Sequence, residues 1–402
     1  MANRMSRGEF IALVAMMFAT IAFSIDSMLP ALPEIGAQLS PDDINRAQLI
    51  LTSFVLGMGI GTFFMGPLSD AFGRKPVIYA GSVLYIVAAA VAWASSSLEL
   101  LLIARVIQGF GCAAPRVVAM AIIRDLYSGR VMARIVSIAM MIFTLVPAVA
   151  PMLGAGMIAF VGWRGIFVSF ILFSLITVIW MGLRLPESLK VENRRPLRLP
   201  LMASAAREMF THPTVRVSIF VQTLCLGMLF TMLTMVQPVY DVIHDSADSF
   251  PFWFGVVALI AGSASLLNAA LVIHVGMRRL VTWALGAQIV VTTGVIIVNM
   301  MPLSANLSFA VFVFWQTSIF FMAGMTMGNL NAIAMEPMGH IAGMAASVIG
   351  AVSTVLAAAI AAPIGQLFDG SLAPLSTGIL VMSLTGFGLM LHMGRIENRL
   401  PA

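Results

Sequence analysis

Long apolar segments separated by short polar ones make up most of the chain. The first apolar segment runs from Phe10 to about Leu32. Eleven more follow, at about 47–65, 77–97, 100–122, 135–160, 165–185, 214–238, 252–274, 280–301, 307–333, 342–366 and 375–394. A helix needs about 20 mainly apolar residues to cross a bilayer. The pattern therefore predicts an all-α membrane protein with twelve transmembrane helices.

The alternation of apolar and polar segments is interrupted once, at residues 186–213. This stretch contains five Lys and Arg residues and four prolines, which predicts a solvated cytoplasmic linker. A weak repeat relates the two sides of it, because Phe72–Lys75 after the second span has a degenerate partner in Val275–Arg279 after the eighth. Such repeats are typical of transporters with two related halves. We therefore expect six-helix halves at residues 1–185 and 214–402, related by pseudo-symmetry.

Composition supports the membrane assignment and orients the chain. Apolar residues make up 60% and charged residues 10% of the 402 positions, and the mean hydropathy is +1.01, which excludes a soluble domain. Of the 22 Lys and Arg residues, eighteen lie on the side of the amino terminus, Arg46 and Arg164 lie on the other side, and Arg105 and Arg116 lie within the fourth span. Because basic loops face the cytoplasm, both termini are predicted to be cytoplasmic, and the net charge of +5 does not indicate nucleic-acid binding.

The sequence contains no pattern typical of an enzyme or an ATP-driven pump. Cys112 and Cys225 lie in predicted spans of different halves, and the five histidines are scattered, so we expect no metal site. Neither a nucleotide-binding loop nor a nucleophile motif occurs. We therefore expect no cofactor and no catalytic activity.

The polar stretch from Gly66 to Pro76, Gly-Pro-Leu-Ser-Asp-Ala-Phe-Gly-Arg-Lys-Pro, is predicted to be a short cytoplasmic turn between two spans. Its glycines allow two helix ends to approach, and its charges can reach facing helix termini. The stretch resembles the signature loop of the major facilitator superfamily, whose members have twelve helices in two halves. The resemblance implies a gating role for Gly66, Asp70, Gly73, Arg74 and Lys75.

Two charged residues within predicted spans are candidates for proton coupling, because charges in the membrane are costly and usually functional. Asp26, in Asp26-Ser-Met-Leu-Pro-Ala-Leu-Pro33, resembles the opening of the bicyclomycin-resistance (Bcr/CflA) branch of the drug:proton antiporters. Arg105, in Arg105-Val-Ile-Gln-Gly109, matches the superfamily's Arg-x-x-Gln-Gly motif. The resemblance implies that Asp26 carries the proton and that Arg105 is its charge partner. Gln108 is three residues after Arg105, on about the same helix face, and is expected to bond the arginine or the substrate. The alternatives are an interfacial Asp26 that caps a broken helix end and an Arg105 that only ties helices together.

The fifth span contains prolines and glycines that resemble the antiporter motif of this branch, ending in Gly162-Trp-Arg-Gly-Ile-Phe167. The candidate hinge residues are Pro147, Pro151, Gly154 and Gly156. Prolines bend a helix and small residues allow close packing, so the motif favours export over uptake; ordinary packing glycines are the alternative. Stretches at Arg124–Tyr127 and Pro337–Ser347 also resemble the branch, and Glu336 is either a second titrating group or an acid at headgroup level.

By the same resemblance, spans one, four, seven and ten face a central cavity. Its candidate lining residues, besides Gln108, are Gln222, Met232, Met235, Gln237, Trp315, Gln316, Phe320 and Asn329. Methionine adapts to irregular shapes and aromatic rings stack on flat compounds, so the set suits bulky, partly apolar substrates. The alternative is that these residues face lipid or neighbouring helices.

Together these features predict a proton-coupled secondary transporter that exports small, partly apolar organic compounds by alternating access. Its predicted partners are protons, the substrate and the lipid bilayer of a bacterial inner membrane, in which it is expected to act as a monomer. A dedicated exporter or importer of one metabolite is an alternative within the same class. A transport-inactive membrane sensor is the alternative from another class.

Overall fold

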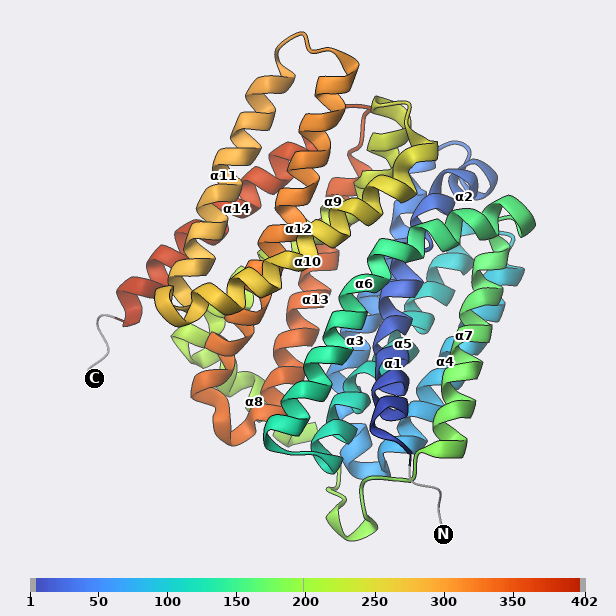
Figure 1. Cartoon of the computed structure of the whole chain (residues 1–402), viewed down its shortest axis with the longest axis vertical. Coiled ribbons are helices and arrows are strands. Elements are labelled where there is room, and N and C mark those ends of the chain that lie inside the picture. Colours follow the sequence, from blue (N-terminus) through green and yellow to red (C-terminus); the bar gives the residue numbers. More distant parts are fainter. Residues whose placement is uncertain (1–4, 198, 398–402) are drawn as a thin grey trace. The chain divides into compact units, whose positions relative to one another are not determined.

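A computed structural model describes residues 5–197 and 199–397, and this part of the chain consists of helices and their connections, without a β-strand (Figure 1). Residues 1–4, 198 and 398–402 lie outside the described residues. They include Arg4, Arg198 and Arg399, three of the basic positions that were counted for the orientation.

The chain divides into two compact units, Met1–Leu199 and Pro200–Ala402. The elements of the first unit are α1 (Arg7–Asp26), η1 (Leu29–Ala31), α2 (Leu32–Leu39), η2 (Ile44–Gln48), α3 (Leu49–Phe72), α4 (Arg74–Ala94), α5 (Leu98–Leu126), α6 (Gly129–Val161), α7 (Arg164–Arg184) and η3 (Val191–Asn193). Helix α8 (Leu199–Thr211) begins at the boundary. The remaining elements are α9 (Pro213–Pro238), η4 (Val239–Ile243), η5 (Ala247–Ser249), α10 (Phe250–Val275), α11 (Met277–Asn299), α12 (Ala305–Met335), η6 (Glu336–Ile341), α13 (Ala342–Gln366) and α14 (Ala373–Glu397).

The boundary between the units falls within residues 186–213, the range predicted as a linker. This range is more ordered than the sequence indicated, because α8 forms in its second part. Met202, Ala205 and Met209 recur at helical spacing and are buried, so one face of α8 has an apolar surface to pack. The prolines and basic residues of the range had masked this periodicity.

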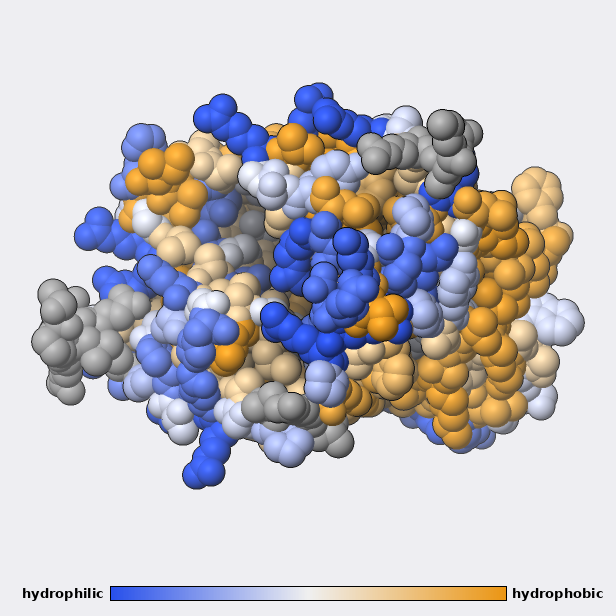
Figure 2. All heavy atoms as spheres, turned by 90° about the horizontal axis from the view of Figure 1, so that it is seen from below, coloured by the Kyte–Doolittle hydropathy of each residue, from blue (hydrophilic) through white to orange (hydrophobic). Residues whose placement is uncertain are grey.

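Eleven helical segments in the described residues are long and apolar enough to cross a membrane. One of them, Ala305–Gln366, has 62 residues and comprises α12, η6 and α13, with a non-helical backbone at Met338. The predicted total of twelve spans and the cytoplasmic placement of the termini remain predictions. Large apolar side chains such as Phe160, Leu183 and Ile273 stay exposed along these segments, as expected where lipid is the solvent. Figure 2 shows hydrophilic residues gathered over much of one end face and hydrophobic residues along its right-hand flank.

Helix α5 is packed against its neighbours through glycines. A Cβ atom at Gly109 of α5 would overlap the carbonyl oxygen of Phe54 on α3, and a Cβ at Gly57 of α3 would overlap the carbonyl oxygen of Val106 on α5. On another side, a Cβ at Gly111 would overlap the carbonyl oxygen of Gly81 on α4. The backbones therefore touch directly, which small residues permit, and α5 is held firmly enough to position its polar side chains.

Candidate functional site

Asp26 is the last residue of α1 and its side chain is 5% exposed. Among the described residues its carboxyl group has no hydrogen-bond or ion-pair partner. Beyond it the chain passes into η1 and α2, where Pro30 and Pro33 lack the backbone N–H that a continuing α-helix would use. Burial without a partner is costly for a charged carboxylate, so this residue differs from an ordinary structural acid.

Arg105 lies on α5 and is fully buried. Its Nη2 donates to the carbonyl oxygen of Ser24 on α1 at 2.9 Å, its Nε donates to the carbonyl oxygen of Ile50 on α3 at 3.3 Å, and its Nη1 donates to Oε1 of Gln108 at 2.8 Å. The guanidinium also lies 4.3 Å from the ring centroid of Phe54, a cation–π contact. Arg105 thus joins α1, α3 and α5.

Arg105 and Asp26, which the sequence indicated as charge partners, form no direct ion pair in the described residues. The guanidinium instead donates to two backbone carbonyl groups and one side-chain amide oxygen, which engage three of its five N–H groups. The link between the two residues is the backbone of α1, because Arg105 holds Ser24, two positions before Asp26. The contact with Gln108, three residues along the same helix face, is one of the two partners that were expected for that amide.

Two further polar residues belong to this cluster and were not singled out from the sequence. The hydroxyl groups of Ser24 and Tyr85 on α4 lie 2.6 Å apart, and the Ser24 hydroxyl also donates to the carbonyl oxygen of Thr20. Both side chains are buried. A polar residue in an otherwise apolar span is a signal for a helix contact, and Ser24 carried that signal, but its partner on α4 lies 61 residues away.

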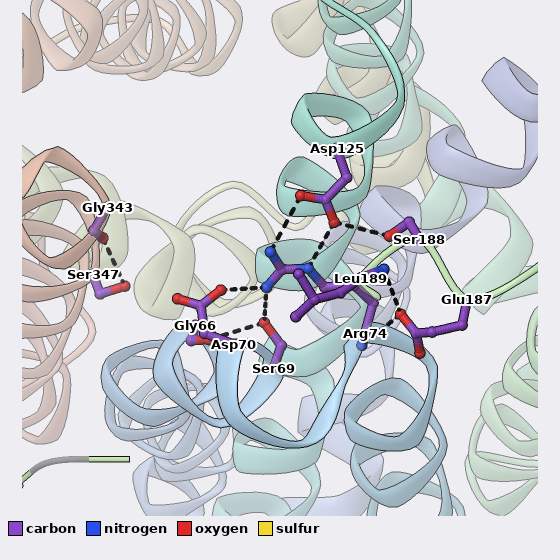
Figure 3. A network of polar contacts seen from close by, with 10 residues as sticks. All are labelled: Gly66, Ser69, Asp70, Arg74, Asp125, Glu187, Ser188, Leu189, Gly343 and Ser347. Carbon is purple, nitrogen blue, oxygen red and sulfur yellow. Dashed lines mark hydrogen bonds and ion pairs between the residues drawn. The ribbon is translucent and has the colours of Figure 1, made fainter. Parts of the chain in front are cut away.

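A second cluster surrounds Arg74 at the start of α4 (Figure 3). Arg74 forms ion pairs with Asp70 on α3 and with Asp125 on α5, the latter at 2.9 Å, and donates to the Ser69 hydroxyl at 2.8 Å. Ser188 donates to Asp125 at 2.9 Å. Because the Arg74 side chain is nearly buried, its pairs have less competition from water than surface ion pairs have.

The sequence prediction of a short turn at Gly66–Pro76 was wrong in its extent. Helix α3 continues through Pro67 to Phe72, and α4 begins at Arg74. Only Gly73 between them is non-helical, with φ of 105°, a conformation that glycine adopts readily. Two helices meeting at one residue leave the first N–H groups of α4 without helical partners.

The carboxylate of Glu187 satisfies these groups. It accepts hydrogen bonds from the backbone N–H of Arg74 at 3.0 Å and of Lys75 at 2.9 Å, as expected for an acid at a helix N-terminus. The Nζ of Lys75 in turn donates to the carbonyl oxygens of Gly182 and Leu185 at the end of α7. Glu187 was not identified from the sequence. The feature that could have indicated it is the Pro186-Glu-Ser triplet directly after the sixth predicted span.

The candidate hinge lies in α6, which is continuous through Pro147 and Pro151. A Cβ atom at Gly154 would overlap the carbonyl oxygen of Ser27, the residue after Asp26. Gly156 has no atom within 4 Å of a Cβ position, so no close approach requires it. Of the two glycines, Gly154 is therefore the one that brings α6 against the end of α1 that carries the buried acid.

The sequence matches the Major Facilitator Superfamily over residues 12–363. The chain belongs to this superfamily. It is 31% identical over 361 residues to the bicyclomycin resistance protein homolog of Haemophilus influenzae, covering 88% of each chain. It is 24% identical to the multidrug resistance protein MdtL of Shewanella oneidensis, covering 81% of each chain. These matches confirm the resemblance to the bicyclomycin-resistance branch that the motifs indicated.

Solved structures agree with this fold. The crystal structure of the D-xylose-proton symporter aligns with a TM-score of 0.73 over 96% of this chain and 97% of that chain, at 15% sequence identity. The major facilitator fold predicted from the sequence is thereby confirmed, and the chain is a multi-pass membrane transporter.

The candidate substrate residues on α9 and α12 differ in whether their side chains already have hydrogen-bond partners. Trp315 donates its Nε1–H to Thr292 on α11 at 3.0 Å, and Asn329 exchanges amide hydrogen bonds with Asn268 on α10. Gln316 accepts a hydrogen bond from the Tyr240 hydroxyl at 3.1 Å. Met232 and Met235 are fully buried in α9, and Phe320 on α12 is half-buried. Trp315 and Asn329 thus already have partners within their own unit.

Four glutamine side chains in the set retain buried amide atoms without a hydrogen-bond partner among the described residues. These are Nε2 of Gln108, Oε1 of Gln222, Oε1 of Gln237 and Nε2 of Gln316. A buried polar atom without a partner is costly, so these atoms have capacity for a ligand or for water.

Arg74→Lys is expected to lower stability by about 2 kcal/mol and to slow transport, because a lysine ammonium cannot reach Asp70, Asp125 and Ser69 at once. Thermal unfolding of the purified protein and initial transport rates measure the two effects. Arg46→Lys is the matched control, since Arg46 pairs with Glu99 at the surface, where an ion pair contributes about 0–1 kcal/mol. Equal effects of the two substitutions would contradict a special role for the Arg74 cluster.

Proposed function

We propose that the protein exports small, partly apolar organic compounds from the bacterial cytoplasm across the inner membrane in exchange for protons. The observation that carries the proposal is the buried, unpartnered carboxyl group of Asp26, next to the Ser24 carbonyl that Arg105 holds. The relatives named as bicyclomycin and multidrug resistance proteins support the choice of export and of this substrate class.

The proton step follows from the setting of Asp26. A carboxylic acid tolerates a buried site without a partner, whereas a carboxylate there bears the full desolvation cost. When the end of α1 becomes open to water, the acid can release its proton and the carboxylate is solvated. Asp26 therefore favours one arrangement of the transporter when protonated and another when ionised. The proton is thus a ligand with different affinities for the two arrangements, and only such a ligand can shift the equilibrium between them.

Arg105 acts in this proposal as a positioning residue. It fixes the backbone of α1 at Ser24 and the backbone of α3 at Ile50, so a movement of α1 has to break or remake these bonds. Its positive charge, which arginine cannot lose, keeps the surroundings of Asp26 favourable to the ionised form once water enters. The Gly154 contact transmits the same movement to α6.

The Arg74 cluster is proposed to latch the cytoplasmic ends of α3, α4 and α5 through Asp70 and Asp125. Glu187 adds the segment after α7 to this latch. In the second unit, the substrate is proposed to bind through the free amide atoms of Gln222, Gln237 and Gln316 together with the methionine and aromatic side chains of that unit. In the first unit, the free amide atom of Gln108 is proposed as a substrate-binding group.

The proposal is tested with purified protein in liposomes that contain a pH-sensitive dye under an imposed proton gradient. We expect that bulky, partly apolar test compounds release protons across the membrane only when protein is present. Protein-free liposomes and liposomes without compound are the controls. Proton movement with one metabolite alone would favour the dedicated transporter, and binding of compounds without any proton movement would contradict proton coupling and favour a uniporter or a sensor.

A further inference from the structure

Helix α5 carries a second arginine within the predicted membrane region, Arg116, to which the proposed mechanism gives no role. It lies eleven residues after Arg105, which is about three helical turns, so both arginines are on nearly the same face of α5. The exposed apolar residues Leu100, Ile103 and Ile107 lie on the opposite face. Arg116 therefore does not belong to the face of α5 that carries its exposed apolar side chains.

Arg116 lies within the predicted fourth span, 100–122, six residues before its end, which corresponds to about 9 Å at 1.5 Å per residue. Helix α5 continues beyond the span to Leu126. A charged side chain inside a span is costly and is usually functional.

The surroundings of Arg116 differ from those of Arg105. Arg105 is fully buried and its guanidinium has three hydrogen-bond acceptors. The Arg116 side chain is exposed, and its one described contact is with the Phe143 ring on α6, at 5.9 Å from the ring centroid. The carboxylate nearest to it along α5, Asp125, is already paired with Arg74. Arg116 is thus an accessible cation in the membrane region without an anionic partner among the described residues.

The contact with Phe143 also connects Arg116 to the candidate hinge. Pro147 lies four residues after Phe143 and has no N–H to donate to the Phe143 carbonyl. The Phe143 backbone is therefore one of two places at which a proline interrupts the hydrogen-bond ladder of α6, the other being one turn before Pro151. A group that binds between Arg116 and the Phe143 ring contacts α6 at one of these places.

We propose that Arg116 and Phe143 bind the anionic group and the adjoining apolar ring of an organic acid, such as an aromatic carboxylate, that the transporter carries. A guanidinium matches a carboxylate through two parallel hydrogen bonds, and the phenyl ring covers the apolar part of the same molecule. The inference rests on the proposed function, in which such a compound is the cargo. It adds to the proposed function that the partly apolar substrates include compounds with a negative charge.

The test compares 2-naphthoate with 2-naphthamide, which have nearly the same shape but differ in charge at pH 7.5. Binding to the purified protein is measured by titration calorimetry. The wild type is expected to bind the acid at least about tenfold more tightly, as charge-assisted hydrogen bonds imply. Arg116→Gln is expected to bring the two affinities within about twofold, and Arg116→Lys to keep part of the preference.

Unchanged binding of the amide by Arg116→Gln shows that the variant is folded, and Arg46→Gln controls for loss of a positive charge elsewhere. A wild type that binds neither compound, or both equally, overturns the inference, and so does an Arg116→Gln variant that keeps the preference. Proton movement with neutral compounds but no preference for 2-naphthoate leaves the proposed function intact. A preference for 2-naphthoate that depends on Arg116, without any proton movement, supports this site and contradicts the proposed proton coupling.

Discussion

Asp26→Asn is expected to reduce compound-driven proton movement at least about 100-fold, to the level of protein-free liposomes, while binding of the compound changes less than about threefold. Asparagine has nearly the shape of aspartic acid but cannot take up or release a proton. Because Asp26 has no hydrogen-bond or ion-pair partner among the described residues, the substitution breaks no contact there. The measurement is the dye signal in liposomes, together with the exchange of labelled for unlabelled compound.

Retained exchange of compound in Asp26→Asn would separate a lost proton carrier from a lost fold. Asp26→Glu is expected to recover part of the proton movement, since it restores a titrating carboxyl group. Asp42→Asn is the matched control, because Asp42 is an exposed acid in the connection after α2. If proton movement persists unchanged in Asp26→Asn, Asp26 is structural, and Glu336 in η6 becomes the next candidate.

Gly109→Val is expected to destabilise the protein by about 3 kcal/mol or more and to prevent much of it from being purified in folded form. A Cβ atom at Gly109 would overlap the carbonyl oxygen of Phe54. Overpacking a core costs about 1–3 kcal/mol even where side chains can adjust, and here the obstacle is backbone. Since Phe54 also covers the Arg105 guanidinium, a displaced α3 would disturb the Arg105 cluster as well. Thermal unfolding and size-exclusion profiles measure the effect.

Gly294→Val in α11 is the matched control, because no atom lies within 4 Å of a Cβ at Gly294. We expect this control to be purified like the wild type. Gly109→Ala should have a smaller effect than Gly109→Val, in the same direction. Equal yields and equal unfolding temperatures for Gly109→Val and Gly294→Val would contradict direct backbone contact between α3 and α5.

The membrane class, the family and the positions of the long helices could be predicted from the sequence. Each of these depends on a local requirement: an apolar segment must be long enough to cross the bilayer, and its backbone groups must bond within the helix. The pair of Arg105 and Gln108 is a further example, since three residues along a helix place two side chains on one face. Asp26 and Arg105 could likewise be recognised as unusual from the sequence, because each is a charged residue among apolar neighbours.

The partners of these residues were decided by the tertiary structure. Arg105 bonds backbone carbonyls at Ser24 and Ile50, which are 81 and 55 residues away, and a carbonyl group has no sequence signal because every residue has one. Arg74 finds Asp125 51 residues away, and Glu187 reaches the N-terminus of α4 across 113 residues.

The connection at Gly73 and the exposure of Arg116 were also decided by the tertiary structure. One glycine with positive φ was enough to join two helices, where the charged sequence around it had indicated a longer turn. The accessible position of Arg116 on α5 depends on which helices cover that face. The sequence by itself determined which segments are long and apolar enough to cross a membrane and which residues are chemically unusual within them, because hydropathy is a property of each segment. Packing alone determined which of those residues are paired and which are left free, because a partner is defined by distance in space.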